Sequence, residues 1–297
     1  MDLLTGAVEE KIQGDILDPA VRREYGAAIG GIAAVLAELY ANIPAGKRIS
    51  YGRVHTVKVL ADYLHARLAA AGAPVLDIAA GLYEASGDPL SKGVALGILS
   101  LCGLDDYRPV LPFFEAAAAA GDWETREIAQ MLFRKLIKKH PAEMKAFLLR
   151  LVEADDARLR RFVGETLRPV QENRWFYAQP DYSLAVLRRL FRERVAYPRT
   201  SVGNGLSDLA RRLPELVYGL VEELVASSDK NSYWIAYRAC RNLVKRDPIR
   251  VMDLLHVDGY RYKKAVTTRS QGRSRDAAPE EPGTAPFAGV EIEKKAR

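Results

Sequence analysis

YPRTSVGNGLSDLARRLP, residues 197–214, is followed by NSYWIAYRACRNLVKRDP, residues 231–248. Each stretch predicts one amphipathic helix. The helix begins after a polar or proline-bearing turn and ends with two basic residues, one further residue and a proline. This is a typical sequence signal for the end of a helix. Two such stretches in succession indicate a repeat.

The same ending recurs earlier in the chain. It appears as KKHP at Pro141 and in weaker form at Pro109 and Pro180, so that successive prolines lie 32 to 39 residues apart. This period is typical of stacked helix pairs of the armadillo or HEAT type. Apolar residues between the prolines recur every three or four positions, as in helices. The sequence therefore predicts an all-α fold without a sheet: an α-α superhelix, or ARM/HEAT-like solenoid.

The predicted domain organisation is simple. With 297 residues, 48% of them hydrophobic, the chain is long enough to build a large core, and we expect residues 1–264 to form a single solenoid domain. The first 25 or so residues are expected to be a loosely structured lead-in with an acidic helix. Residues 265–297 are rich in Pro, Gly, Ser and charge, cannot offset their ordering entropy, and predict a disordered tail.

Several protein classes are excluded by composition. The two cysteines, Cys102 and Cys240, are far apart and lack the spacing of a metal site. No apolar run reaches the roughly 18 residues that a membrane span requires, and no targeting segment opens the chain. We therefore expect a cytoplasmic protein with reduced thiols, no membrane partner, no metal and no organic cofactor.

Positive charge is concentrated in one half of the sequence. Residues 1–120 carry 10 Lys/Arg and 14 Asp/Glu, whereas residues 121–264 carry 28 and 19. A basic half of this kind is typical of proteins that bind a phosphate-rich partner. The alternative is that these charges only form an ordinary solvated surface. Helix-dipole compensation explains the basic pairs that precede the prolines, but not the arginines in the middle of the repeats.

Two short segments could carry chemistry. Ser50 and His55 lie five residues apart, but no third group is placed to orient them, so a surface or capping role is favoured for His55. Glu165 lies one turn from Arg161 and three residues from Arg168, and this positive charge keeps its carboxylate ionised. A structural ion pair is the alternative for Glu165.

Three runs together resemble the HEAT-like alkylpurine DNA glycosylases, closest to the AlkC branch of the AlkC/AlkD group. They are RRFVGETLRP at 160–169, SVGNGLSDLARRLPEL at 201–216 and WIAYRACRNLVKRDP at 234–248. The resemblance covers roughly residues 122–256. It implies a curved all-helical solenoid that binds duplex DNA on its concave side.

The resemblance also assigns residues. It implies that Asp208 is the catalytic aspartate, that Glu165 and Trp175 belong to the catalytic site, and that Trp123 and Trp234 are further aromatic candidates. From the residues alone, Asp208 could instead pair with Arg211 or Arg212 on its own helix. The expected DNA-binding residues are Arg160, Arg161, Arg168, Arg174, Arg199, Arg211, Arg212, Arg238, Arg241 and Lys245.

The sequence departs from the family pattern in three respects. The loop RPVQENRW at 168–175 is longer than usual, Gln130 stands where the branch has a carboxylate, and no Ig-like domain follows the repeats. The missing carboxylate puts turnover in doubt, because the reaction depends on negative charge beside a developing cationic sugar.

The expected activity is hydrolysis of the N-glycosidic bond of cationic alkylated purines in double-stranded DNA, by a monomer. Two alternatives remain open. One is a non-catalytic relative that recognises branched or distorted DNA, and the other is a HEAT scaffold that binds proteins.

Overall fold

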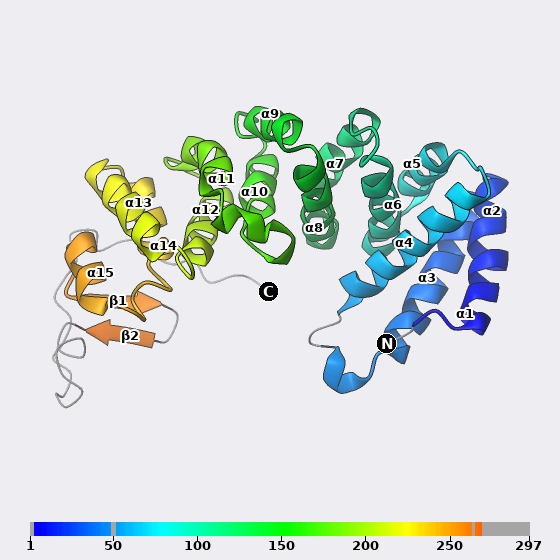
Figure 1. Ribbon diagram of the computed structural model, residues 1–297, viewed down its shortest axis with the longest axis horizontal. Helices are drawn as coiled ribbons and strands as arrows, with labels where there is room; N and C mark the ends of the chain where they lie inside the picture. Colours follow the sequence, from blue (N-terminus) through cyan, green and yellow to red (C-terminus); the bar gives the residue numbers. More distant parts are fainter. Residues whose placement is uncertain (1–2, 49–51, 263–264, 269–297) are drawn as a thin grey trace. The chain divides into compact units, whose positions relative to one another are not determined.

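The computed structural model describes residues 3–48, 52–262 and 265–268 of the chain. These residues fall into two compact units, 1–146 and 147–297, each built from paired helices (Figure 1). The predicted HEAT-like fold of paired helices is confirmed, but the expected absence of a sheet is not, because residues 259–262 and 265–268 form a two-stranded sheet. The finer prediction, one solenoid domain at 1–264 followed by a tail, stays a prediction.

Unit 1 contains the first eight α-helices and three short helices of other types. Its elements are α1 (Gly6–Lys11), the π-helical η1 (Ile12–Leu17), α2 (Asp18–Val21), α3 (Tyr25–Asn42), η2 (Ala45–Lys47), α4 (Arg53–Ala70), α5 (Val75–Ala85), α6 (Pro89–Cys102), η3 (Arg108–Val110), α7 (Leu111–Ala118) and α8 (Trp123–Lys139). The boundary between the units falls within α9 (Pro141–Leu151).

The described part of unit 2 contains further helices and, after them, two strands. Its elements are α10 (Ala157–Thr166), η4 (Gln171–Tyr177), α11 (Pro180–Leu187), η5 (Arg188–Leu190), α12 (Ala196–Leu209), α13 (Pro214–Ala226), α14 (Lys230–Ala239), α15 (Pro248–Leu255), β1 (Gly259–Tyr262) and β2 (Ala265–Thr268). The strands are antiparallel, with Gly259 opposite Thr268 and Tyr262 opposite Ala265.

The repeat prolines begin helices as well as ending them. Pro141, Pro180, Pro214 and Pro248 are the first residues of α9, α11, α13 and α15. Proline suits this position because its fixed φ is helical and its missing N–H would have no partner there. Each proline therefore separates the two helices of a pair, which is why its spacing reports the repeat.

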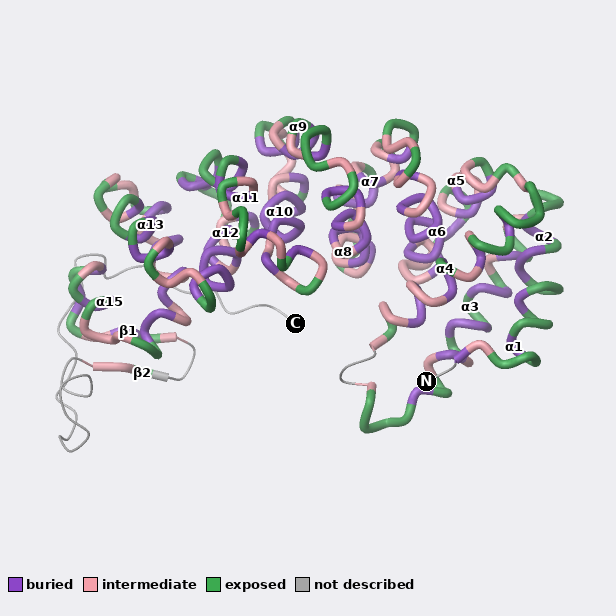
Figure 2. Tube along the Cα trace, in the orientation of Figure 1, coloured by how far each residue is buried: buried purple, intermediate pink, exposed green. Residues whose placement is uncertain are grey.

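Helix α12 is the centre of unit 2. It packs against α10 on one side and α14 on the other. From Ser201 to Ala210 every residue is buried except Asn204, which is half-buried (Figure 2). Leu206 and Val202 contribute to the apolar core, whereas Ser201 and Asp208 bring polar groups inside. Polar side chains buried on α12 need partners from the neighbouring segments, which are α10, α14 and the turns that follow these two helices.

Three local expectations were wrong. Residues 6–21 are helical and bury Val8, Ile12 and Ile16, so the N-terminal segment is part of the core rather than a loose lead-in. Helix α14 ends at Ala239 and continues as turns, where the Asn242 amide donates to the Ser207 carbonyl at 2.7 Å. Residues 265–268, expected in the tail, form β2, and residues 269–297 lie outside the described residues.

Within the described ranges, no helix is long and apolar enough to cross a membrane.

Candidate functional site

Two buried carboxylates in unit 2 share one guanidinium group. Glu165 on α10 and Asp208 on α12 are each 5% exposed. Arg168 donates from Nε and Nη2 to Oδ2 of Asp208, at 2.9 and 2.6 Å, and from Nη1 to Oε2 of Glu165 at 2.9 Å. Charge-assisted hydrogen bonds of this length are among the stronger ones in proteins. Sequence reasoning selected all three residues, and the structure brings them together.

Glu165 is held in its ionised form. Burial acts to raise the pKa of its carboxyl, but the positive charges of Arg168 and Arg161, with hydrogen bonds from Ser201 and Arg168, outweigh burial and lower that pKa below the ordinary 4.5. The Ser201 hydroxyl donates to Oε1 at 2.7 Å, and Arg161 Nη2 lies 3.7 Å from the same oxygen. Glu165 is thus a buried negative charge held in place by Arg168, Arg161 and Ser201.

The second oxygen of Asp208 is contacted less closely. Arg211 Nη2 and Arg241 Nη2 each lie 3.5 Å from Oδ1. The alternative pairing with Arg211 on the same helix is therefore present, whereas Arg212 lies over the ring of Tyr177, 5.0 Å from its centroid. Oδ1 is therefore the less tightly bound oxygen of this carboxylate.

The helical spacing explains why these groups meet. Arg161 and Glu165 are four residues apart and share a face of α10, and Arg168 follows three residues later in the turn after that helix. Close packing of α12 against α14 depends on Gly203, because a Cβ placed there would lie 2.9 Å from the Cβ of Arg238. This contact lets the Arg238 side chain cross α12, where its Nε donates to Oδ1 of Asn204 at 2.9 Å.

Arginines in this region lie over aromatic rings. Arg161 is 4.6 Å from the centroid of Tyr197, and Arg199 is 4.8 Å from that of Trp234. Arg238 lies over the same indole at 5.4 Å. Such contacts orient a guanidinium while leaving its N–H groups able to bind an anion. We call the residues Arg161, Tyr197, Arg199, Trp234, Arg238 and Arg241 the arginine–aromatic row.

Other predicted residues lie apart from the carboxylates or at the surface. Arg160 binds Glu193 through Nε at 2.6 Å and donates to the carbonyls of Ala154 and Asp155 at 2.7 and 2.9 Å. Its donors are therefore engaged within the protein. Arg174 and Lys245 are exposed. Their predicted contact with DNA stays a prediction.

The predicted aromatic residues differ in their surroundings. Trp175 packs against Phe176 and Tyr182, with ring centroids 4.5 and 4.9 Å away, and among the described residues its buried Nε1 has no hydrogen-bond partner. Trp123 in unit 1 is 64% exposed. The proposed catalytic role of Trp175 remains a prediction.

Sequence reasoning missed three polar members of the site. Ser201 and Asn204 precede Asp208 by seven and four residues, so helical spacing from Asp208 could have found them. Tyr262 accepts a hydrogen bond from Arg241 Nη1 at 3.1 Å and lies on β1. No local pattern places a residue of this strand beside α14.

Two further predicted features lie elsewhere. Gln130 on α8 of unit 1 is buried and donates through Nε2 to Glu127, while its Oε1 has no partner among the described residues. Ser50 lies outside the described residues, and His55 is in the first turn of α4. In the described part of the chain, no group of three or more His, Cys, Asp and Glu side chains is arranged to hold a metal ion.

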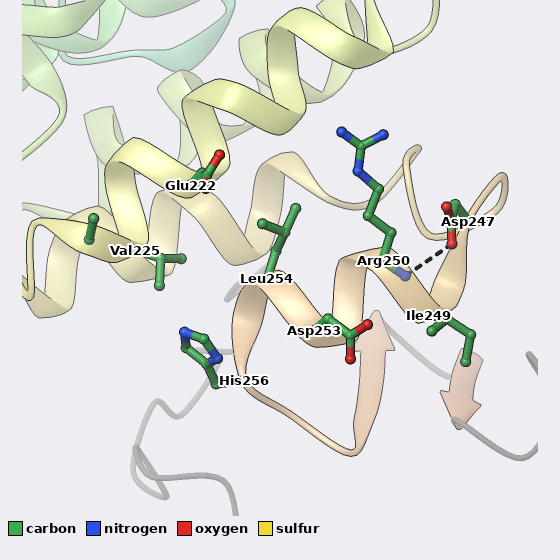
Figure 3. A pocket seen from close by; sticks show the side chains of 9 residues that line it. Glu222, Val225, Asp247, Ile249, Arg250, Asp253, Leu254 and His256 are labelled. Atoms are coloured by element: carbon green, nitrogen blue, oxygen red, sulfur yellow. Dashed lines mark hydrogen bonds between the residues drawn. The ribbon is translucent and has the colours of Figure 1, made fainter.

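A surface pocket between α13 and α15 contains none of the predicted site residues (Figure 3). Two of its charged residues, Asp247 and Arg250, make contacts within the fold. Asp247 accepts from the backbone N–H of Arg250 at 3.0 Å, and the Arg250 guanidinium pairs with Glu215 and lies 3.7 Å from the centroid of Tyr218. The candidate site therefore consists of the carboxylate cluster, by which we mean Glu165, Arg168 and Asp208, and the arginine–aromatic row.

Three solved structures have a similar fold at low sequence identity. The alkylpurine DNA glycosylase AlkC of Pseudomonas fluorescens, bound to DNA containing an abasic site analog, matches with a TM-score of 0.56 and 19% identity, over 82% of this chain and 69% of that one. AlkD2 of Streptococcus mutans matches with a TM-score of 0.50 and 18% identity, over 71% and 98%. The protein smu.31 of Streptococcus mutans UA159 matches with a TM-score of 0.48 and 18% identity, over 62% of this chain and 98% of that one.

These similarities concern the fold. A scan against protein-family models finds no match, and neither does a search of curated proteins. The chain thus has the HEAT-like fold of the AlkC and AlkD2 structures at low sequence identity. Assignment to the AlkC branch stays a prediction.

Proposed function

We propose that this chain binds double-stranded DNA along the arginine–aromatic row and hydrolyses the N-glycosidic bond of cationic alkylated purines at Asp208. The observation that carries the proposal is the buried Asp208 carboxylate, which is positioned by Arg168 and bordered by Arg241 of the row. The fold shared with a glycosylase crystallised on DNA supports it.

The row has the chemistry that a DNA surface requires. Arg161, Arg199 and Arg238 are half-buried and stacked on aromatic rings, and guanidinium groups presented in this way suit phosphate oxygens. Phosphate contacts supply much of the affinity and position the duplex. The half-buried ring of Trp234 adds apolar surface against which a sugar or base can pack.

Hydrolysis at Asp208 needs little acid catalysis. A purine that carries a methyl group on a ring nitrogen is cationic, so it leaves as a neutral base with the electron pair of the glycosidic bond. The electron-deficient sugar is stabilised by the carboxylate, and water adds to C1′ and gives its proton to Oδ1 or to solvent. Oδ1 is the oxygen for this role, because Oδ2 is occupied by both donors of Arg168.

One observation favours a second function, DNA recognition without catalysis. Asp208 is paired with Arg168 through two short hydrogen bonds, and its side chain is only 7% exposed. A carboxylate neutralised in this way stabilises a neighbouring cation less well. In this alternative, the cluster holds α10 and α12 together beneath a surface that recognises branched or distorted DNA.

The discriminating experiment is single-turnover release of 3-methyladenine and 7-methylguanine from methylated duplex DNA, with binding to intact and branched duplexes measured in parallel. The glycosylase proposal expects release that depends on Asp208. Tight binding without release supports the non-catalytic alternative. Failure to bind either DNA rejects both and leaves the protein-binding scaffold.

A further inference from the structure

The strand pair at the end of unit 2 is fixed to α14 by tyrosines. Tyr260 is almost fully buried, its ring stacks on Tyr237 with centroids 4.5 Å apart, and its hydroxyl donates to the Tyr237 carbonyl at 2.8 Å. The Tyr237 hydroxyl in turn accepts from the Arg261 N–H at 2.7 Å. These contacts involve both backbone and side chains, so β1 has one position on α14.

Strand geometry then brings Tyr262 to the candidate site. Alternate residues of a strand share a face, so Tyr262 lies on the same side as Tyr260, while Arg261 between them is exposed. The Tyr262 hydroxyl accepts from Nη1 of Arg241 at 3.1 Å. Its ring centroid lies 5.4 Å from Arg241 and 6.0 Å from Arg238.

Arg241 transmits this contact to the carboxylate. Its Nη2 points to Oδ1 of Asp208 at 3.5 Å, while Nη1 is held by Tyr262 and lies 3.5 Å from Oδ1 of Asn204. The guanidinium is a rigid planar fork, so fixing one nitrogen fixes the other. The hydrogen bond to Tyr262 is the shorter of the two on Nη1 and therefore sets the orientation of the fork.

We propose that Tyr262 is a positioning residue of the site: it holds Arg241 in the orientation that faces Oδ1 of Asp208 and the DNA backbone, which makes the strand pair part of the DNA-binding surface. The inference rests on the proposed function and extends it to a segment outside the helical repeats. Among the described residues, the other hydrogen bond of Arg241 Nη1 is the one to Oδ1 of Asn204 on α12, which is longer than the one to Tyr262.

Two tyrosine variants separate positioning from folding. Tyr262→Phe removes the hydroxyl that Arg241 contacts and keeps the ring. Tyr260→Phe is the matched control, because it removes a hydroxyl of the same strand that bonds only to the Tyr237 carbonyl among the contacts described above. We expect Tyr262→Phe to weaken duplex DNA binding by about twofold to tenfold, the effect of losing one hydrogen bond. Tyr260→Phe keeps the ring that stacks on Tyr237, so it should lower the melting temperature and reduce DNA affinity less than Tyr262→Phe does.

A double-mutant cycle with Arg241→Gln tests the mechanism. If Tyr262 acts through Arg241, Tyr262→Phe has no further effect on DNA affinity in the Arg241→Gln background, and both single variants reduce the salt slope of binding, by up to about 0.9 for one phosphate contact. Additive losses, or equal losses from the two tyrosine variants, would overturn the inference.

The experiments also distinguish failure of this inference from failure of the proposed function. If DNA is bound but no base is released, the hydrolysis proposal fails. The positioning role of Tyr262 still holds in that case if the effects of the Tyr262 and Arg241 substitutions on DNA affinity are non-additive. If no DNA is bound, the same cycle is measured by urea unfolding of the free protein. Non-additive stability changes then retain the link between Tyr262 and Arg241, and additive ones remove it.

Discussion

Arg168 donates twice to the same oxygen of Asp208, at 2.6 and 2.9 Å, across a separation of 40 residues in sequence. The carboxylate is therefore a buried group rather than the partly exposed one that the helical sequence pattern predicts. We expect Asp208→Asn to lower the free energy of unfolding by about 1–3 kcal/mol, because a charged hydrogen-bond pair inside the protein is lost. Base release should fall by about 100-fold or more, since a transition-state stabiliser is removed.

Glu193→Gln provides the control for this variant. Glu193 is another buried carboxylate of unit 2, bound by Arg160, and it is not part of the cluster. Its substitution should produce a comparable fall in melting temperature without loss of base release, when both variants are assayed well below their melting temperatures. Equal kinetic losses in the two variants would mean that Asp208 has only a structural role.

Glu165 predicts a dependence of stability on pH. Its pKa in the folded protein is below the ordinary 4.5, so its ionised form stabilises the fold above that value, and this contribution is lost as the pH falls through the folded pKa. Glu165→Gln should therefore lower the melting temperature at pH 7 and have a smaller effect at about pH 3. The measurement is thermal unfolding of both proteins across this range.

An exposed carboxylate of the same unit checks the assignment. Glu222 on α13 is exposed, and Glu222→Gln should change the melting temperature little at either pH. A difference between wild type and Glu165→Gln that stays constant from pH 7 to 3 would contradict the linkage. It would indicate that hydrogen bonding from Ser201, and not charge, is the main contribution of Glu165.

The helix pairs could be predicted because their signals are local. A proline at the first position of α11, α13 and α15 acts through its own φ angle, and the basic residues before it act on the adjacent helix end. The contacts that create the site are not local. Ser201 reaches Glu165 across 36 residues, so the sequence could suggest a local pairing of Glu165 with Arg168 but not the hydrogen bond from Ser201 on α12.

The terminal strands were missed for a related reason. Residues 259–268 contain only four-residue strands, and their apolar alternation is too short to distinguish from a loop. Their position depends on the stacking of Tyr260 on Tyr237, a contact with a preceding helix. Composition alone therefore assigned residues 265–268 to the tail.

Two glycines of α12 give a prediction about packing. A Cβ at position 203 would lie 2.9 Å from the Cβ of Arg238, whereas one at position 205 would meet its nearest neighbours at 3.9 Å. Alanine favours a helix interior over glycine by about 1 kcal/mol. Gly205→Ala should therefore be neutral or stabilising, while Gly203→Ala should lower the melting temperature and weaken DNA binding by displacing Arg238 from Asn204. Equal effects of the two substitutions would mean that α12 and α14 are not packed this closely.

The last prediction separates DNA contact from compensation of helix dipoles. Arg211 and Arg212 follow α12 just as Lys138 and Lys139 end α8, and all four side chains are exposed. Only Arg211 and Arg212 adjoin the candidate site, Arg211 through Asp208 and Arg212 through Tyr177. If both arginines bind phosphates, Arg211→Gln/Arg212→Gln should reduce the salt slope of duplex binding by about 1.8, which is about 0.9 for each contact.

Lys138→Gln/Lys139→Gln removes the same charge from the end of another helix. Loss of favourable interaction with a helix dipole should lower the melting temperature of either double variant slightly, because both pairs lie at helix C-termini. The slope of log affinity against log salt, measured from about 50 to 200 mM, should change only for the arginine pair. Equal changes in slope would mean that DNA responds to net charge alone, and an unchanged slope for Arg211→Gln/Arg212→Gln would exclude this end of α12 from the DNA interface.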